Sequence, residues 1–287
     1  MKYRHAFHAG NFADVHKHVV LTGLLEALQR KDKGFLYVDT HAGEGLYDLR
    51  SHDARQAEQE SAGGIERVLA RRGPADTANA APPLVARYLQ LVDGARRQSG
   101  LRHGYPGSPW LAAAMARPQD RLICCESSTE AFVALRRALR DAPHCVFENI
   151  DGYARLPALL PPHERRGLVL LDPPYEDGRD DRRRLGQALE AALRRFATGV
   201  YALWYPIKHE ADTDRWLGSL AAKLDAPTLR TELWVHPRDS RVGLNGSGLL
   251  IVNPPYQLDE QLRDSLPWLH ASLAESVRTG GWSVGPG

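Results

Sequence analysis

The strongest constraint on the fold of this chain is a regular alternation of short apolar runs with segments of helical spacing. The apolar runs of strand length are residues 35–39, 121–126, 144–151, 167–172, 199–207, 231–237 and 248–253. Strands that alternate with helices are joined by right-handed crossovers and form a parallel sheet covered by helices on both faces. Ligands bind beyond the carboxyl ends of such strands. The alternation therefore predicts an α/β fold with its functional residues at strand ends.

The alternation is interrupted once, by a polar and alanine-rich stretch over residues 51–103. This stretch has helical patterns on either side of a break rich in Pro, Gly and Ala, and no convincing strand. We therefore expect an N-terminal segment and first strand in residues 1–50, with a helix over about 13–30. Residues 51–103 would form a small inserted helical subdomain, and residues 104–287 the remainder of the domain that begins before it.

Bulk properties place few limits on the partners of the chain. No run approaches the roughly 18 consecutive apolar residues of a membrane-spanning helix, and the N-terminus lacks the apolar centre of a signal peptide. We therefore expect a cytoplasmic protein with no membrane partner, whose three cysteines are buried and reduced. The net charge of +2 neither requires nor excludes a nucleic-acid partner. Arginine clusters such as DRRR at 181–184 are most simply interpreted as solvated helix faces.

Acidic residues end three of the expected strands. Asp39 begins DTHAGEG, whose glycines let the backbone approach a ligand closely. Glu126 can accept hydrogen bonds from a ribose diol, and Asp151 precedes Gly152, which allows a sharp turn. Each acid alone could simply cap the following helix or turn. Together they indicate a cofactor that contains adenosine but no pyrophosphate, because DTHAGEG lacks the third glycine of the dinucleotide fingerprint.

The fourth strand ends in Asp172-Pro173-Pro174-Tyr175. Proline fixes φ and has no N–H, so a Pro-Pro pair makes a stiff turn whose carbonyls are open to a ligand. The exocyclic amine of a base is a poor nucleophile, because its lone pair is delocalised into the ring. Hydrogen bonds from that amine to the Asp172 carboxylate and the Pro173 carbonyl would free the lone pair. Tyr175 would offer a flat face to an extruded base, so the tetrapeptide predicts an amine-modifying site.

This series of motifs resembles the Rossmann-like S-adenosylmethionine-dependent amino-methyltransferases, whose active-site tetrapeptide is D/N-P-P-Y/F/W. More specifically, the chain resembles the bacterial 23S ribosomal RNA adenine-N6 methyltransferase J family over nearly its whole length. The resemblance implies a class I methyltransferase fold: a mostly parallel seven-stranded sheet with an antiparallel last strand, plus a helical insertion placed to meet RNA. The matching stretches are YRHAFHAGNFADVHKH, DTHAGEGLY, YPGSP, GLVLLDPPYE and RFATGVYALWYPI.

The resemblance also implies roles for individual residues. Asp172, Pro173, Pro174 and Tyr175 would form the catalytic, amine-activating site. Tyr3 and Arg4 would lie over the pocket and contact the RNA together with Tyr175. The expected contacts of S-adenosylmethionine are Lys17, His41, Gly43, Ser108, Glu126, Asp151, Gly152 and Asp172.

A second tetrapeptide of the same type, NPPY, follows the last expected strand at residues 253–256. If that strand is antiparallel, its carboxyl end emerges at the edge far from the cofactor, so NPPY is expected to be a structural strand stop. By the same geometry the loop HPRDSRVGLNGSG emerges on the cofactor side. Arg238 and Arg241 in this loop would be phosphate contacts or members of a solvated loop. Trp204 and Tyr205 would border the base pocket or pack in the core.

The histidines near the N-terminus suggest a metal site only superficially. None of their spacings is diagnostic and no cysteine lies nearby, so no metal is expected. The better interpretation is that His8 or His41 lies near the cofactor as a neutral hydrogen-bonding group. The residues concerned are His5, His8, His16, His18 and His41.

Four functions are compatible with these patterns to different degrees. The preferred one is transfer of a methyl group from S-adenosylmethionine to N6 of an unpaired or flipped adenine in 23S ribosomal RNA. An adenine-N6 methyltransferase of DNA would share the chemistry but turn over duplex DNA. A non-catalytic RNA-binding protein of the same fold would bind RNA without product, and the intact DPPY argues against it. A NAD-dependent dehydrogenase is the most distant, because its fingerprint is incomplete.

Overall fold

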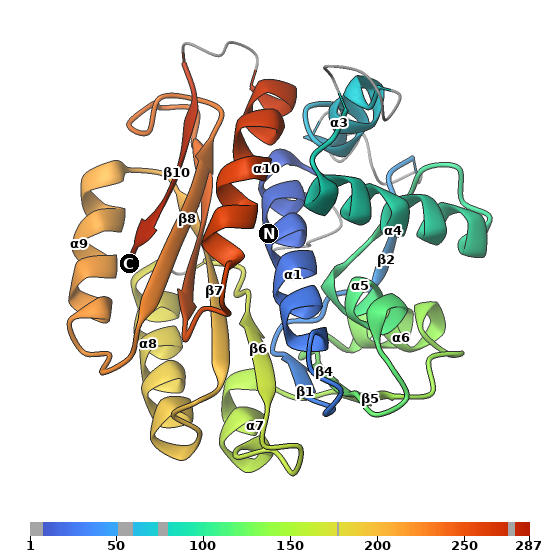
Figure 1. Cartoon of the computed structure of the whole chain (residues 1–287), viewed down its shortest axis with the longest axis vertical. Coiled ribbons are helices and arrows are strands. Elements are labelled where there is room, and N and C mark those ends of the chain that lie inside the picture. The colour runs from blue at the N-terminus through green and yellow to red at the C-terminus, as the bar shows by residue number, and fades with distance from the viewer. Residues whose placement is uncertain (1–7, 51–59, 74–79, 177, 275–278) are drawn as a thin grey trace.

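The computed structural model describes residues 8–50, 60–73, 80–176, 178–274 and 279–287, and its centre is an eight-stranded sheet with helices on both faces (Figure 1). The strands of the sheet are β1 Leu36–Asp39, β4 Arg121–Cys125, β5 Cys145–Glu148, β6 Gly167–Leu171, β7 Val200–Ile207, β8 Thr228–Trp234, β9 Gly246–Val252 and β10 Gly281–Pro286. A separate two-stranded ribbon is formed by β2 Leu46–Asp48 and β3 Gly104–Pro106. The helices are α1 Phe12–Gln29, α3 Ile65–Arg71, α4 Pro83–Ser99, α5 Ser108–Met115, α6 Thr129–Ala138, α7 Gly152–Leu159, α8 Gly178–Arg195, α9 Glu210–Ala221 and α10 Leu258–Leu273.

The strand order is β10-β8-β9-β7-β6-β1-β4-β5. Strands β5, β4, β1, β6 and β7 are parallel to one another, whereas β9 is antiparallel to both β7 and β8. The expected fold class, including the antiparallel strand over residues 248–253, is confirmed. The sheet has one strand more than the seven expected, because the glycine-containing tail pairs as β10 with β8. Pro286 is tolerated there because an edge strand need not donate every N–H.

Successive strand residues point to opposite faces of the sheet, and each face has its own hydrophobic core. Tyr37 and Cys124 belong to the core beneath α1, α4, α5 and α10, whereas Val38 and Cys125 belong to the core on the side of α7, α8 and α9. Cys124 and Cys125 are buried, Cys145 is half-buried, and all three are free thiols. Burial raises the pKa of each of them. The expectation of burial holds for Cys124 and Cys125 and only in part for Cys145.

Helix α1 crosses the sheet between α4 and α10 and is buried along most of its length (Figure 1). It begins where the Asn11 side chain accepts hydrogen bonds from the backbone N–H groups of Ala13 and Asp14, both at 2.9 Å. Gly23 allows the neighbouring helices to approach closely, since a Cβ there would lie 3.1 Å from Leu258 and 3.2 Å from Leu84. Polar side chains on α1 are therefore held inside the protein rather than in solvent.

The helices of the expected insertion, α3 and α4, pack into the same core as α1 and α10. The turn before α1 lies directly against the start of α3: Ile65 N–H donates to the Gly10 carbonyl at 2.8 Å. A Cβ on Gly64 would lie only 2.0 Å from that carbonyl oxygen, so the two backbones touch. Asn11 also donates to the Glu60 carboxylate at 3.1 Å. The N-terminal segment and the insertion are thus tied together at the backbone.

Candidate active site

Four acidic strand-end residues, Asp39, Glu126, Asp151 and Asp172, meet at one edge of the sheet, because β1, β4, β5 and β6 are parallel neighbours. A cavity of about 290 Å³ lies at this edge. Its lining combines backbone turns with acidic side chains, as expected for a polar ligand. The lining residues are Thr40, His41, Ser127, Asp151, Gly152, Tyr153, Pro173, Pro174, Glu176, Asp180, Asp181 and Arg184.

Glu126 connects the glycine turn after β1 to the end of β4. Its Oε2 accepts a hydrogen bond from Gly43 N–H at 2.8 Å, and its Oε1 accepts from Ser128 N–H at 2.7 Å. Gly43 has φ +62°, and a Cβ there would lie 2.3 Å from the Tyr47 hydroxyl, so only glycine fits. Each carboxylate oxygen keeps a second lone pair. Glu126 can therefore hold the turn and still accept hydrogen bonds from a ligand.

Asp39 lies below this surface and is fully buried. Tyr37 donates to its Oδ2 at 2.8 Å, and the Ser108 hydroxyl also hydrogen-bonds to the carboxyl group. Burial raises the pKa of Asp39 to about 6, although the hydrogen bonds from Ser108 and Tyr37 lower it. Ser108 itself is 5% exposed. The structure thus places Ser108 against Asp39, one layer behind the cavity, rather than in the cavity lining.

His41 follows Asp39 and Thr40 at the floor of the cavity. Thr40 Oγ1 donates to the Leu170 carbonyl at 3.0 Å, so its contact of 2.8 Å with His41 Nδ1 makes Nδ1 the protonated nitrogen. Burial lowers the pKa of His41 to about 4, and the imidazole is therefore neutral at physiological pH. Its Nε2 keeps a lone pair for an incoming donor. The edge of the ring meets Tyr153, with 4.8 Å between centroids.

Asp151 is the N-cap of α7: its Oδ1 accepts from Tyr153 N–H at 2.9 Å. The capping role that the sequence left open is therefore real, but it uses one oxygen only. The other oxygen accepts from Arg184 at 2.5 Å. Gly152 brings α7 against the end of β1, since a Cβ there would lie 2.2 Å from the Thr40 carbonyl oxygen. Asp151, Gly152 and the cavity floor at Thr40 are thus packed directly against one another.

Asp172 is paired with a buried lysine from α1. Lys17 Nζ donates to Asp172 Oδ2 at 2.5 Å and lies 2.8 Å from Asp14 Oδ1. The Lys17 side chain is 3% exposed. Burial by itself would lower the pKa of Lys17, but the two carboxylates outweigh it and raise that pKa well above its usual range. Lys17 is therefore a permanent ammonium that fixes one oxygen of Asp172 and leaves the other oxygen for a donor.

Tyr175 packs beside this ion pair. Its hydroxyl donates to the Trp204 carbonyl at 2.6 Å, and its ring is edge-on to the Trp204 ring. Tyr175 is only 6% exposed, so stacking of a base on it needs a free ring face and stays a prediction. Trp204 is half-buried, with Lys17 Nζ 5.6 Å from its ring centroid. The sequence left open whether Trp204 and Tyr205 border the base pocket or pack in the core. Trp204 lies at the site, whereas Tyr205 lies in the core, where its hydroxyl donates a hydrogen bond to Glu232.

The second tetrapeptide lies at the opposite edge, because β9 runs antiparallel to β7. Asn253 has φ +55° and donates to the carbonyls of Ala197 and Gly199, both at 2.8 Å. Tyr256 is 81% exposed. The interpretation of NPPY as a strand stop is therefore confirmed, and of the two tetrapeptides DPPY lies beside the cavity.

Comparison with known proteins agrees with this geometry. The model of the family described as "Ribosomal RNA large subunit methyltransferase D, RlmJ" matches residues 32–285. This chain belongs to that family. Two relatives, both named "Ribosomal RNA large subunit methyltransferase J", come from Escherichia coli K12 and Haemophilus influenzae. The first is 40% identical over 95% of this chain and 94% of its own; the second is 38% identical over 99% and 98%.

A solved structure shares the fold of this chain. The crystal structure of a Legionella pneumophila protein is 33% identical, covers 98% of each chain and superposes with a TM-score of 0.86. The resemblance inferred from the motifs is thus confirmed, and the chain is a methyltransferase that uses S-adenosylmethionine. The residue roles within the family site remain proposals.

Some expected site residues are not placed at the cavity. Tyr3 and Arg4 lie outside the described residues. The Arg238 side chain is 16% exposed and forms ion pairs with Glu210, Asp214 and Glu232, so it is neither solvated nor open to a phosphate in this structure. The loop that carries Arg238 does emerge on the cofactor side, since β8 is parallel to the central strands.

The histidines of this family member serve separate packing roles. His8 Nδ1 lies 2.8 Å from Glu60, His16 Nδ1 lies 3.0 Å from Ser247 Oγ, and His18 Nδ1 lies 2.8 Å from the Tyr105 hydroxyl. Glu60 raises the pKa of His8 by accepting its hydrogen bond. Of the two histidines offered as the neutral group near the cofactor, His41 is the one that lines the cavity. Across the described ranges no three His, Cys, Asp or Glu side chains are grouped as metal ligands. No helix in those ranges is long and apolar enough to cross a membrane.

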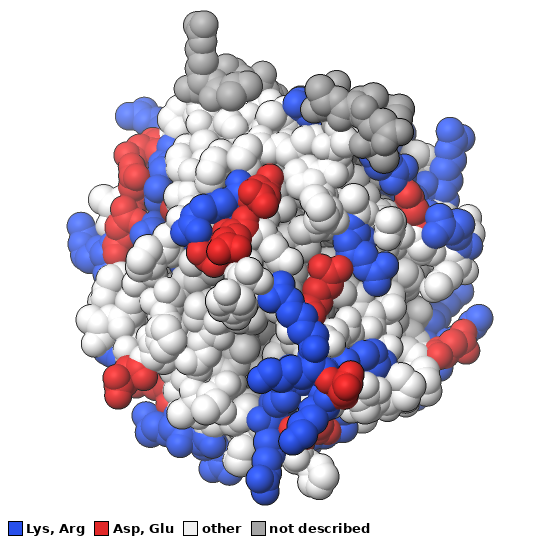
Figure 2. Space-filling model, viewed as in Figure 1, with Lys and Arg blue, Asp and Glu red and all other residues white. Residues whose placement is uncertain are grey.

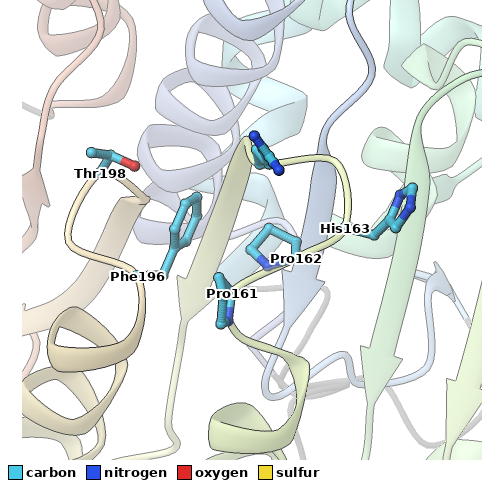
Figure 3. Close-up of a pocket in the computed structure, with 6 residues that line it drawn as sticks. Pro161, Pro162, His163, Phe196 and Thr198 are labelled. Atoms are coloured by element: carbon cyan, nitrogen blue, oxygen red, sulfur yellow. The ribbon is translucent and has the colours of Figure 1, made fainter.

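A second cavity lies at the opposite edge of the sheet, where β6 and β7 begin (Figure 3). Its volume is about 650 Å³, and its lining of Pro161, Pro162, Phe196 and their neighbours includes none of the expected site residues. Figure 2 shows Lys and Arg gathered most densely in the lower middle of the visible face, with a few Asp and Glu among them. Arg121 is paired with Glu164 at 2.8 Å.

Two residues of the site were missed by sequence reasoning. Asp14 shares the Lys17 ammonium with Asp172 and accepts from Gly10 N–H at 3.1 Å. Arg184 belongs to the DRRR cluster interpreted as a solvated face, yet it lines the cavity. The available signal was the helical spacing of α8, which places Arg184 on a different face from Arg183.

Proposed function

We propose that this protein transfers a methyl group from S-adenosylmethionine to the N6 amine of an adenine in 23S ribosomal RNA. The main support is the 2.5 Å pair of Lys17 and Asp172, directly before the two prolines that line the strand-end cavity. Relatives from two bacteria, 40% and 38% identical, are named ribosomal RNA large subunit methyltransferase J. The 23S molecule and the N6 atom are the finer part of the proposal.

The strand-end cavity fits the cofactor in three respects. Glu126 keeps lone pairs for ribose hydroxyls, and the close approach of Gly152 to Thr40 exposes backbone at the cavity wall. The Tyr153 hydroxyl is buried and has no hydrogen-bond partner among the described residues, so a bound ligand can supply one. When bound, S-adenosylmethionine supplies a methyl group activated by a positively charged sulfur.

We assign the cofactor-holding roles as the motifs suggested, with the exception of Ser108. His41 offers Nε2 as an acceptor, and Gly43 shapes the turn. Ser108 acts indirectly, by holding Asp39 beneath the cavity floor. Lys17 and Asp172 lie where the cofactor and the target base would meet. The direct contacts would be His41, Gly43, Glu126, Asp151 and Gly152.

The target amine would be activated by acceptors and not by a strong base. Lys17 holds Asp172 Oδ2, so Oδ1 remains to accept one N–H of the amine, and the Pro173 carbonyl would accept the other. Two such hydrogen bonds favour a more tetrahedral nitrogen with its lone pair aimed at the methyl group. Trp204 and Tyr175 would form the wall against which the base rests. Positioning and electrostatic preorganisation would then supply most of the rate enhancement.

The RNA would approach over the N-terminal segment and the insertion. We propose that residues 51–103 form a helical subdomain within the methyltransferase domain, and that Tyr3 and Arg4 contact the target nucleotide. The protein would act in the cytoplasm, where ribosomal RNA is modified in bacteria. Neither a metal nor a membrane takes part in this proposal.

Methyl transfer from labelled S-adenosylmethionine to protein-free, unmodified 23S ribosomal RNA tests the function. Duplex DNA is assayed in parallel, the labelled nucleosides are identified, and Asp172→Ala serves as the inactive control. We expect N6-methyladenine on the RNA alone. Label on DNA but not on RNA would keep the amine chemistry and reject the substrate. RNA binding without any label, from a protein that binds the cofactor, would reject the catalytic role.

A further inference from the structure

Arg184 on α8 forms an ion pair with Asp151 at the strand-end cavity. The roles assigned above give this ion pair no function. Arg184 Nη2 donates to Asp151 Oδ2 at 2.5 Å, and its guanidinium lies over the Tyr153 ring, with 5.4 Å from Cζ to the centroid. Among the described residues that line this cavity, Arg184 is the single Lys or Arg, facing Asp151, Glu176, Asp180 and Asp181. An arginine so placed determines where the Asp151 carboxylate points.

The hydrogen bonds of Asp151 leave little freedom. Oδ1 is used by the cap on α7, with Tyr153 N–H at 2.9 Å, and Oδ2 by Arg184. One remaining lone pair on Oδ2 can accept a donor from the cavity, such as the exocyclic amine of an adenine. Without Arg184, the carboxylate could rotate about its bond and face solvent, since its side chain is 42% exposed.

We propose that Arg184 is a positioning residue for the cofactor: it holds Asp151 so that Oδ2 accepts the adenine amine of S-adenosylmethionine, and thereby sets cofactor affinity. This inference rests on the proposed function, because it requires an adenosine cofactor in this cavity. Arg184 touches neither the methyl group nor the target base in this arrangement. Its loss should therefore affect cofactor binding more than the rate at saturating cofactor.

Arg183, the preceding residue on α8, is a matched control. It pairs with Asp180 on the same helix at 2.5 Å, and its side chain is 58% exposed. It does not line the cavity. Arg183→Ala and Arg184→Ala thus remove the same group from adjacent positions of one helix. Neither side chain is in the core, so both variants should fold.

Binding of S-adenosylhomocysteine, measured by calorimetry, is the first readout. Arg184→Ala should raise the Kd about tenfold or more, because the hydrogen bond from the adenine amine to the Asp151 carboxylate loses its alignment. The Kd of Arg184→Lys should lie between those of Arg184→Ala and the unmodified protein. Arg183→Ala should bind like the unmodified protein. The second readout is an analogue with purine in place of adenine. The preference for adenine over purine should be large in the unmodified protein and nearly lost in Arg184→Ala, an effect that general loosening would not produce.

The outcomes separate this inference from the function beneath it. If the unmodified protein binds S-adenosylhomocysteine and Arg184→Ala binds it within twofold, the positioning role is overturned and the methyltransferase function stands. An equal loss of affinity for the adenine and purine forms would also overturn it. Failure of the unmodified protein to bind either form would overturn the proposed function together with this inference.

Discussion

The Lys17 ammonium lies 2.5 Å from Asp172 Oδ2, so a buried cation on α1 is joined to the first residue after β6. The same ammonium lies 2.8 Å from Asp14. One lysine therefore balances two carboxylates inside the protein. Removal of one member of such a buried group leaves an uncompensated charge, which costs more than the loss of a surface pair.

Lys17→Met should impair both stability and turnover. The substitution leaves the Asp14 and Asp172 carboxylates without their shared counter-ion, so the free energy of unfolding should fall by about 3 kcal/mol. Turnover should fall by about 100-fold or more, because Asp172 is no longer held in place. Denaturant unfolding and methyl transfer measure the two effects. Adding Asp14→Asn should restore part of the stability; a double variant that is no more stable than Lys17→Met would contradict the shared-ammonium account.

Asp172→Ala should abolish turnover and leave the affinity for S-adenosylmethionine nearly unchanged. The carboxylate is proposed to act on the target amine, whereas the cofactor is held mainly by residues after β1, β4 and β5. Single-turnover methylation and calorimetry are the measurements. Near wild-type turnover would reject the assigned role of Asp172.

Asn253→Ala, in the second tetrapeptide, is the contrasting control for Asp172. It removes hydrogen bonds to Ala197 and Gly199 at the opposite edge of the sheet. We expect a loss of about 1 to 3 kcal/mol in unfolding free energy with unchanged turnover per folded molecule.

Gly152→Ala should weaken the cofactor site through backbone displacement. Its Cβ would lie 2.2 Å from the Thr40 carbonyl oxygen, so α7 would have to move away from the end of β1. The Kd for S-adenosylmethionine should rise about tenfold or more, and stability should fall by about 1 to 3 kcal/mol. Gly218→Ala on α9 is the control, because its Cβ would meet no described atom within 4 Å. That variant should gain about 0.5 to 1 kcal/mol from helix propensity; similar behaviour of both variants would refute the steric argument.

His16 should make the protein less stable as the pH falls. Burial lowers its pKa to about 3, from an ordinary value near 6.5 in the unfolded chain. At a pH between these two pKa values, the unfolded chain binds a proton that the folded protein does not. The contribution of His16 to the free energy of unfolding therefore falls by about 1.4 kcal/mol per pH unit on acidification below about 6.5. His16→Gln should show a shallower dependence between pH 6 and pH 4.5 in denaturant titrations. Equal slopes for His16→Gln and the unmodified protein would exclude the effect.

The parts of the fold and site that the sequence predicts are those set by local pattern. Asp39, Glu126 and Asp172 each follow an apolar run, and parallel strands bring such positions to one edge. Strand β10 was missed because its glycines and proline have low strand propensity. It forms a strand because it pairs with β8.

The parts that were not predicted depend on packing between distant segments. The contact of Lys17 with Asp172 was not specified by the motifs, because it arises from the path of α1 across the sheet. The surroundings of Arg184, in a cluster interpreted as a solvated face, and of Arg238, left open between a phosphate contact and a solvated loop, were not predicted for the same reason. The sequence of an arginine run does not indicate which arginine faces a carboxylate on another element. Here Asp151 sets the position of Arg184, and Glu232 sets that of Arg238.

The backbone contact between Gly10 and Gly64 gives the molecule a mechanical linkage. The two backbone segments touch with no side chain between them, so a displacement of the start of α3 would also move the turn at Gly10. Asn11 caps α1 from this turn, and Asp14 lies in the first turn of the helix. If RNA binding displaced the insertion, the displacement would therefore pass through the first turn of α1 to the Lys17 ammonium, which is proposed to align Asp172 with the target amine.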